Sequence, residues 1–188
     1  MCEIRITHLE KRINSCLESS FKYEPINIKT SILINGVYEI DEIKNLKYDS
    51  NELVNELDSI FKINKNSATK MMKKKNGVII FLFSSNCFNG LGEHYSPILS
   101  LSKLSFMKSI AKELNAYKVS CFGITLSPDF NLEKNDELLK QKKLNIFALK
   151  QKKVQEEEQI NQIRVLIKNH KIFSGQLITL GNGPKLIF

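Results

Sequence analysis

The chain has 188 residues, of which 42% are hydrophobic, and a formal net charge of +8. This length suffices for one substantial core, so we expect a single domain over residues 1–188. No apolar stretch approaches the roughly 20 residues of a membrane span, and the N-terminus lacks a basic segment followed by an apolar signal core. We therefore expect a cytoplasmic protein. The four cysteines lack CxxC or metal-finger spacing, which favours free thiols over disulfides or zinc ligands.

The first third of the chain predicts a helix, a strand and a long helix. Apolar residues recur every three or four positions from Ile6 to Phe21, which indicates a helix with Thr7 as its N-cap. A short apolar strand follows over residues 31–35. Residues 49–75 again show helical apolar spacing and end in three lysines, which suit the negative end of a helix dipole.

The middle of the chain predicts a strand, a helix and a second strand. Val78 to Phe83 is an unbroken apolar run rich in β-branched and aromatic residues, typical of a strand that is buried on both faces. Apolar positions from Leu101 to Leu114 follow helical spacing, so one face of this helix is expected to be buried. Val119 to Leu126 is apolar again and stops before Pro128, which suits a strand end. Together these segments predict a βαβ unit.

The last third begins with a polar, lysine-rich segment over residues 131–153. A helix is expected from Gln159 to Lys168, opened by three glutamates, and a final strand from Phe173 to Leu180. The complete pattern predicts an α/β fold with a mainly parallel sheet. Most lysines fall along presumed helix faces, so we expect a solvated basic surface rather than a nucleic-acid site.

The polar residues at the strand ends carry a family resemblance. Ser84 follows the buried strand, and the segment Tyr95-Ser96-Pro97-Ile98 opens the next helix eleven residues later. The segments Ile32-Leu33-Ile34-Asn35-Gly36 and Ser174-Gly175-Gln176 add two further motifs. In order and spacing these motifs resemble the short-chain dehydrogenase/reductase family, including the 3-oxoacyl carrier-protein reductases. The resemblance covers nearly the whole chain and implies a Rossmann-like three-layer fold.

The resemblance also implies an NAD(P)-dependent oxidoreductase site. In that family a serine polarises the substrate carbonyl, a tyrosine donates a proton, and a lysine one helical turn later assists the tyrosine. Ser84, Tyr95 and Lys103 are the matching catalytic candidates. A second register anchors on Lys103 as the lysine and places Leu99 at the tyrosine. Neither register contains Tyr-x-x-x-Lys.

The resemblance further implies cofactor contacts at Asn35, Gly36 and Pro128. However, the chain contains no GxxxGxG or GxGxxG motif, which would hold a pyrophosphate at a helix N-terminus. We therefore expect a truncated member that lacks the N-terminal dinucleotide-binding segment. An ungapped match also puts Glu56 where the family has an asparagine in its proton relay, and a carboxylate cannot supply both the amide's donor and its acceptor.

Three interpretations remain open at this point. The first is a degenerate oxidoreductase that acts as a non-catalytic or partner-dependent subunit, docking through its long helices. The second is an active ketone or alcohol oxidoreductase, with a 3-oxoacyl or sugar substrate, whose nucleotide-binding half is supplied elsewhere or lost by truncation. The third, nucleic-acid binding, is disfavoured because no aromatic stacking platform accompanies the lysines. The first two imply a homo-oligomer or a hetero-oligomer with an intact relative, and the isolated chain is not expected to bind NAD(P).

Overall fold

Five strands form one parallel sheet in the part of the chain that the structure describes. The structure is a computed structural model, and it describes residues 4–7, 30–36, 50–84, 95–126 and 156–180. The strands are β1 (Ile4–Thr7), β2 (Ile32–Asn35), β3 (Gly77–Ser84), β4 (Val119–Leu126) and β5 (Leu177–Thr179). They lie side by side in chain order, and every neighbouring pair is parallel. The predicted α/β fold with a mainly parallel sheet is confirmed.

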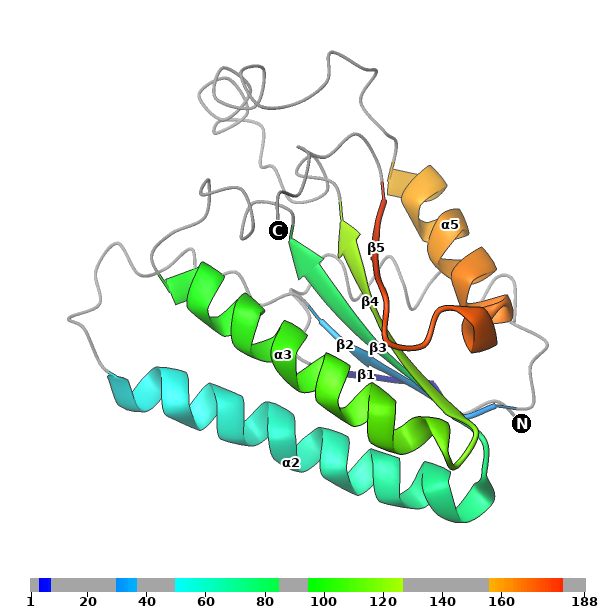
Figure 1. Ribbon diagram of the computed structural model, residues 1–188. Helices are drawn as coiled ribbons and strands as arrows, with labels where there is room; N and C mark the ends of the chain where they lie inside the picture. The colour runs from blue at the N-terminus through cyan, green and yellow to red at the C-terminus, as the bar shows by residue number, and fades with distance from the viewer. Residues whose placement is uncertain (1–3, 8–29, 37–49, 85–94, 127–155, 181–188) are drawn as a thin grey trace.

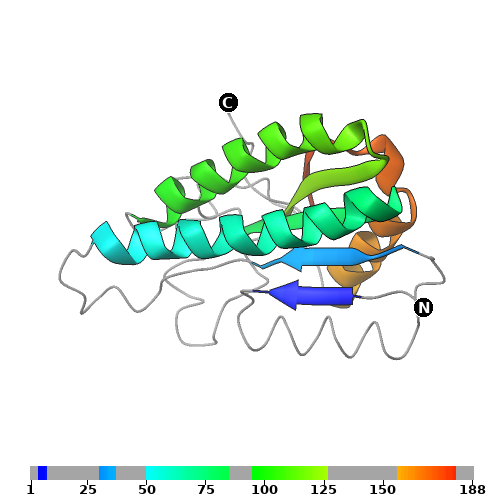
Figure 2. The ribbon, with the colours of Figure 1, turned by 90° about the horizontal axis from the view of Figure 1, so that it is seen from below.

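In the described parts of the chain, three α-helices cover the two faces of the sheet. Helices α2 (Ser50–Lys74) and α3 (Tyr95–Asn115) lie over one face, whereas α5 (Glu156–Lys168) lies over the other (Figures 1 and 2). A short 3-10 helix, η4 (His170–Ile172), follows α5. Strands β3, β4 and β5 advance in one direction across the sheet while α3 and α5 cover opposite faces. The crossover through α5 therefore has the opposite hand to the crossover through α3, which is uncommon in parallel sheets.

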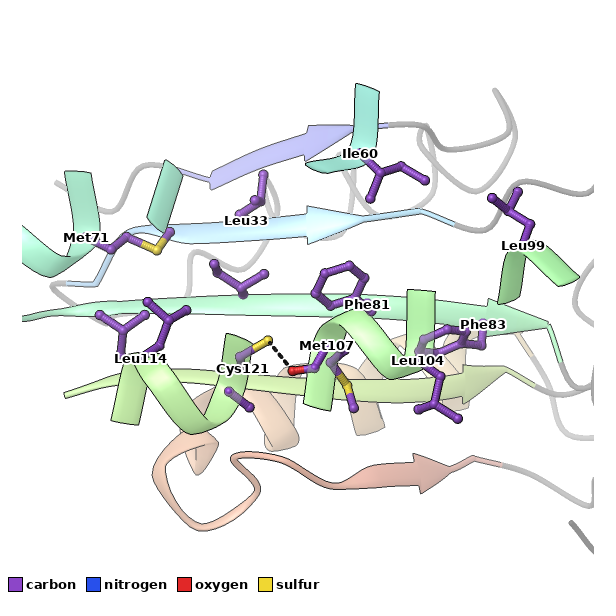
Figure 3. Packing of buried hydrophobic residues seen from close by; sticks show 13 residues of the cluster. Leu33, Ile60, Met71, Phe81, Phe83, Leu99, Leu104, Met107, Leu114 and Cys121 are labelled. Atoms are coloured by element: carbon purple, nitrogen blue, oxygen red, sulfur yellow. Dashed lines mark hydrogen bonds between the residues drawn. The ribbon is translucent and has the colours of Figure 1, made fainter. Parts of the chain in front are cut away.

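The core has two halves because successive side chains of a strand point to opposite faces. On the α5 side, Val78, Ile80 and Leu82 pack with alternate residues of β4 and with α5. On the other side, Ile79, Phe81 and Phe83 pack with α2 and α3. Figure 3 shows Phe81 and Phe83 among the side chains of these two helices. All eight residues of β4 are buried, as expected for a strand with neighbours on both edges and helices on both faces.

Two of the predicted elements need correction. Ile4 to Thr7 form strand β1, paired with β2 from Ile4↔Ile32 to Thr7↔Asn35, so the helix predicted from Ile6 to Phe21 does not begin at Ile6. The remainder of that predicted helix, residues 8–21, lies outside the described residues. A short apolar segment is compatible with either a helix or a strand, and pairing with β2 selects the strand here. The last strand is also shorter than predicted, because residues 173–176 form a turn. Gly175 has a φ of 81° there, in the left-handed region that glycine tolerates best.

No helix among the described residues is long and apolar enough to cross a membrane.

Candidate functional site

A reciprocal pair of side-chain amides lies at the carboxyl end of β2. The Asn35 Nδ2 donates to the Asn64 Oδ1 at 3.0 Å, and the Asn64 Nδ2 donates to the Asn35 Oδ1 at 3.0 Å. The second hydrogen of each amide goes to a backbone carbonyl, Ile80 O at 3.3 Å from Asn35 and Ile60 O at 2.8 Å from Asn64. Both side chains are at most 1% exposed. All four amide hydrogens thus have acceptors, as a buried polar network requires.

The periodicities of β2 and α2 place these two amides opposite each other. Asn35 lies two positions after Leu33, so both point to the α2 side of the sheet. Asn64 lies four positions after Ile60, on the buried stripe of α2. An asparagine within an apolar helical stripe is the sequence signal that could have marked this residue, and our sequence analysis missed it.

Lys103 joins the amide pair from helix α3. Its Nζ donates to the carbonyl of Gly36 at 2.8 Å and lies 5.7 Å from the centroid of the Phe83 ring. The side chain is only 4% exposed. A buried ammonium needs hydrogen-bond acceptors and favourable electrostatics, and the carbonyl and the ring face provide part of both. We call Asn35, Gly36, Asn64 and Lys103 the carboxyl-end cluster.

The other two predicted catalytic residues, Ser84 and Tyr95, lie on elements that border this cluster. Ser84 is the last residue of β3, three positions beyond Phe81, the register partner of Asn35. That separation is roughly 10 Å along a strand. Tyr95 is the first residue of α3 and precedes Lys103 by eight positions, a rise of roughly 12 Å. The side chains of Ser84 and Tyr95, and all of Pro128, lie outside the described residues.

Leu99 occupies the position one helical turn before Lys103. It is 1% exposed and packs in the α2–α3 half of the core, at the end of the sheet where the strands terminate (Figure 3). In the register that keeps Lys103 as the family lysine, this is the tyrosine position. A leucine there can neither donate a proton nor accept one. In that register, an apolar side chain therefore occupies the position where the resemblance implies a proton donor.

The helix residue that contacts the strand end is Asn64 rather than Glu56. Glu56 lies two turns earlier on α2 and is partly buried, and its placement at the family's asparagine rested on an ungapped match. The structure instead shows the amide of Asn64 bonded to the amide of Asn35. Because helix register relative to a strand depends on packing, an ungapped alignment could not determine which turn of α2 reaches Asn35.

Thr125 adds a buried hydroxyl near the carboxyl end of β4. It is 0% exposed, pairs with Phe83 in the sheet register, and its Oγ1 has no hydrogen-bond partner among the described residues. Deeper on the same face, the Sγ of Cys121 lies 3.8 Å from the carbonyl of Met107, and burial raises the pKa of this thiol well above its ordinary range. A protonated thiol in the core is inert as a nucleophile.

A second polar pair lies at the opposite end of the sheet. The Nδ1 of His170 is 2.9 Å from the Oγ of Ser120, and both side chains are buried. Burial, together with the neighbouring Lys171 charge, lowers the pKa of His170 below its ordinary value of 6.5. Ser120 follows the first residue of β4, so this pair is far from the carboxyl-end cluster. No group of three His, Cys, Asp or Glu residues that could hold a metal occurs in the described parts of the chain.

The sequence matches none of the family models and none of the curated proteins with which it was compared. Its structure, however, matches a solved structure of halohydrin dehalogenase (HheC) bound to ethyl (2S)-oxiran-2-ylacetate. The match has a TM-score of 0.63 and 12% sequence identity, and it covers 100% of this chain and 98% of that chain. The chain has the short-chain dehydrogenase/reductase fold. At this identity the similarity shows the fold alone.

The short-chain dehydrogenase/reductase fold implies NAD(P), so we tested whether the described residues fit that cofactor. Dinucleotides bind such sheets where the strand order reverses, and the described strands run from β1 to β5 without a reversal. Both amide hydrogens of Asn35 are taken by Asn64 and Ile80, and the carbonyl of Gly36 accepts Lys103. The described residues therefore do not by themselves form a dinucleotide site. The role assigned to Pro128 stays a prediction.

Proposed function

We propose that this chain is a degenerate short-chain dehydrogenase/reductase-like protein that acts as a non-catalytic or partner-dependent subunit. The observation that carries the proposal is Leu99, buried one helical turn before Lys103. Carbonyl reduction requires a proton donor near the substrate oxygen, and the resemblance assigns that role to a tyrosine at this spacing. An apolar side chain in that place removes the donor while the fold around it is kept.

Lys103 supports the same proposal from its own contacts. The ammonium donates to the Gly36 carbonyl and lies against the Phe83 ring, so it stabilises the packing between α3 and the end of β2. A tyrosine without a neighbouring cation has a pKa near 10, so its phenolate is scarce at neutral pH. Tyr95 precedes Lys103 by two helical turns, whereas the resemblance implies a tyrosine one turn before its lysine.

The alternative is an active oxidoreductase whose nucleotide-binding half comes from another chain. The observation that favours it is the buried position of Lys103 beside the end of β2, with Ser84 ending the neighbouring strand. In this alternative Lys103 is the working lysine, and a partner completes the proton donor and the cofactor site.

Cofactor titration of the isolated chain tests the proposal. We expect no saturable binding of NADH or NADPH at micromolar concentrations, measured by reduced-cofactor fluorescence and by calorimetry. We also expect no turnover of a 3-oxoacyl thioester or a sugar ketone. Saturable binding with turnover by the isolated chain would refute the proposal, and loss of that turnover in Lys103→Met but not in Lys108→Met would identify Lys103 as the working lysine. Lys108 is a matched control because it is an exposed lysine on the same helix.

A further inference from the structure

The three α-helices that the structure describes end at the same edge of the sheet, where β3 and β4 begin. Gly77 and Val119 are register partners, so the segments that precede β3 and β4 are neighbours. The hydrogen bond between His170 and Ser120 places η4 beside the start of β4. Figures 1 and 2 both show the C-termini of α2 and α3 on the same side of the molecule as η4. We call residues 73–76, 112–118 and 168–172 the amino-end surface.

The amino-end surface is strongly basic. It carries seven exposed lysines and a single acid, Glu113, which is also exposed. All three segments contribute, and the lysines are Lys73, Lys74, Lys75, Lys112, Lys118, Lys168 and Lys171. The other acids of the described residues lie in the N-terminal halves of α2 and α5, toward the opposite edge of the sheet, and are Glu52, Glu56, Asp58, Glu156, Glu157 and Glu158. The positive charge of the described residues is therefore concentrated at one end of the molecule.

Helix dipoles account for only some of these lysines. The lysines within the last helical turns meet the negative end of a dipole, and they are Lys73, Lys74, Lys112 and Lys168. Lys75 and Lys118 lie beyond the helices and have φ of 48° and 59°, in the left-handed region that is strained for a residue with a Cβ. Glycine adopts this conformation readily and is common just after helices. A lysine at these positions therefore adds charge to the amino-end surface at a cost in stability.

Two exposed apolar side chains lie among the lysines. Ile172 is 69% exposed, the highest value among the large apolar side chains of the described residues, and it directly follows Lys171. Tyr117 is 42% exposed and directly precedes Lys118. Both residues belong to short connecting segments, η4 and the turn between α3 and β4. The amino-end surface thus presents an aliphatic and an aromatic group next to cations.

We infer that the amino-end surface binds the surface of an anionic lipid bilayer, with its lysines facing the acidic headgroups and with Tyr117 and Ile172 entering the headgroup region. Clustered lysines bind acidic lipids, and apolar side chains beside them add affinity where they are buried at the boundary of the acyl chains. Tyrosine is enriched at this boundary because its ring has an apolar body and a polar tip. The inference goes beyond the proposed function, since the carboxyl-end cluster lies at the other edge of the sheet.

A nucleic acid would account for fewer of these observations. Its phosphates could contact the lysines, but proteins that bind single strands also use aromatic side chains on which successive bases stack. The amino-end surface has one exposed aromatic side chain, Tyr117, and its most exposed apolar residue, Ile172, would have no role. A bilayer is wide enough to contact the lysines and the apolar groups of all three segments at once.

Co-sedimentation with lipid vesicles tests the inference. We expect wild type to bind phosphatidylcholine vesicles that contain phosphatidylserine, and not to bind vesicles of phosphatidylcholine alone. Raising the salt concentration should weaken the binding, because the lysines are exposed and their charges are screened.

The double variant Lys75→Gly, Lys118→Gly separates a binding role of these lysines from a structural one. Glycine relieves the left-handed strain at both positions, so the melting temperature should rise. Binding to the phosphatidylserine vesicles should nevertheless weaken by about 25-fold, since each lysine near an anionic bilayer contributes about fivefold. A variant that is more stable and binds less well cannot owe its loss of binding to unfolding.

The matched control is Lys65→Gln, Lys108→Gln. It removes the same net charge from exposed positions ten residues earlier in the chain than Lys75 and Lys118, outside the amino-end surface. We expect it to weaken vesicle binding by less than about threefold, because charges beyond a Debye length from the bilayer are largely screened.

Ile172→Ser tests the apolar contact with the bilayer. Its melting temperature should equal that of wild type, because the side chain is exposed. Binding to the phosphatidylserine vesicles should weaken by at least about fivefold, since an aliphatic group no longer leaves water. Unchanged vesicle binding by Ile172→Ser would overturn the assigned apolar contact.

Three further results would overturn the inference as a whole. The first is folded wild type that does not associate with phosphatidylserine vesicles. The second is an equal loss of vesicle binding in the glycine and glutamine double variants, which would assign the binding to net charge rather than to the amino-end surface. The third is tighter binding to a fluorescent single-stranded oligonucleotide than to the vesicles, weakened in the glycine variant, which would make the partner a nucleic acid. None of these measurements uses a cofactor or a substrate, so their failure is distinct from failure of the proposed function.

Discussion

Asn35 and Asn64 hydrogen-bond each other through both of their side-chain amides, across 29 residues of sequence and at the point where β2 meets α2. The pair leaves no amide hydrogen unused, because Ile80 and Ile60 accept the remaining two. Adjacent to it, the Gly36 carbonyl accepts Lys103. One polar network thus links β2, α2, β3 and α3 at the edge of the sheet where ligands of such folds bind.

Asn64→Asp should destabilise the protein strongly at neutral pH. A carboxylate there would face the Asn35 Oδ1 and the Ile60 carbonyl with no hydrogen to donate, and a buried unpaired charge costs about 3–5 kcal/mol. Urea denaturation measures the loss. Asn66→Asp is the control, because Asn66 is exposed on the same helix.

The Asn64→Asp penalty should shrink as the pH falls. Burial raises the pKa of the introduced carboxyl in the folded state above its unfolded value of about 3.9. Stability is therefore recovered at low pH, where the protonated acid can donate one hydrogen bond, and it is lost as the pH rises through the folded pKa. An equal penalty at about pH 5 and about pH 8 would show that the amide pair does not carry the effect.

His170 should make stability depend on pH in a defined direction. Its pKa is lowered by burial and by Lys171, so the unfolded chain binds a proton more readily than the folded one. The stabilisation is present above the unfolded pKa of about 6.5 and is lost as the pH falls below it. We expect the difference in urea midpoint between wild type and His170→Gln to shrink on acidification. A difference that grows on acidification would contradict the assignment of a neutral buried imidazole.

Gly123→Ala should destabilise the centre of the sheet by about 1–3 kcal/mol through overpacking. An added Cβ would lie 2.8 Å from Leu177 Cδ1, 2.8 Å from Phe83 Cε2 and 3.1 Å from Met107 Sδ. Thermal unfolding followed by circular dichroism measures the cost. Leu177→Ala in the same chain removes one of the clashing atoms, so the double variant should be more stable than the sum of the single losses predicts. Simple additivity would mean that Leu177 moves aside without cost.

Lys103→Met should cost about 1–3 kcal/mol of stability, because it retains the apolar stem and leaves the Gly36 carbonyl without this donor. Lys108→Met, at an exposed position of the same helix, should change stability by less than about 0.5 kcal/mol. Urea denaturation of the two variants side by side is the measurement. Equal effects would show that the buried ammonium contributes nothing to the packing of α3 on β2.

The core of this fold was predictable because burial leaves a local pattern in the sequence. Val78 to Phe83 and Val119 to Leu126 are continuous apolar runs, and both are strands with helices on both faces of the sheet. The long helix expected over residues 49–75 is α2. Lys103 was recognisable as a candidate only through the family resemblance. Its burial was not, since a lysine on a helix is usually exposed.

Only the tertiary structure decided which segments that are distant in the sequence contact each other. Ile4 to Thr7 could be a helix or a strand until β2 provided a parallel neighbour. Asn64 rather than Glu56 meets Asn35 because the packing of α2 on the sheet determines which turn of the helix reaches the end of β2. Hydrophobic periodicity is a property of neighbouring residues and can be read along the chain. The partner of a buried amide is chosen by where two elements cross, which depends on every contact between them.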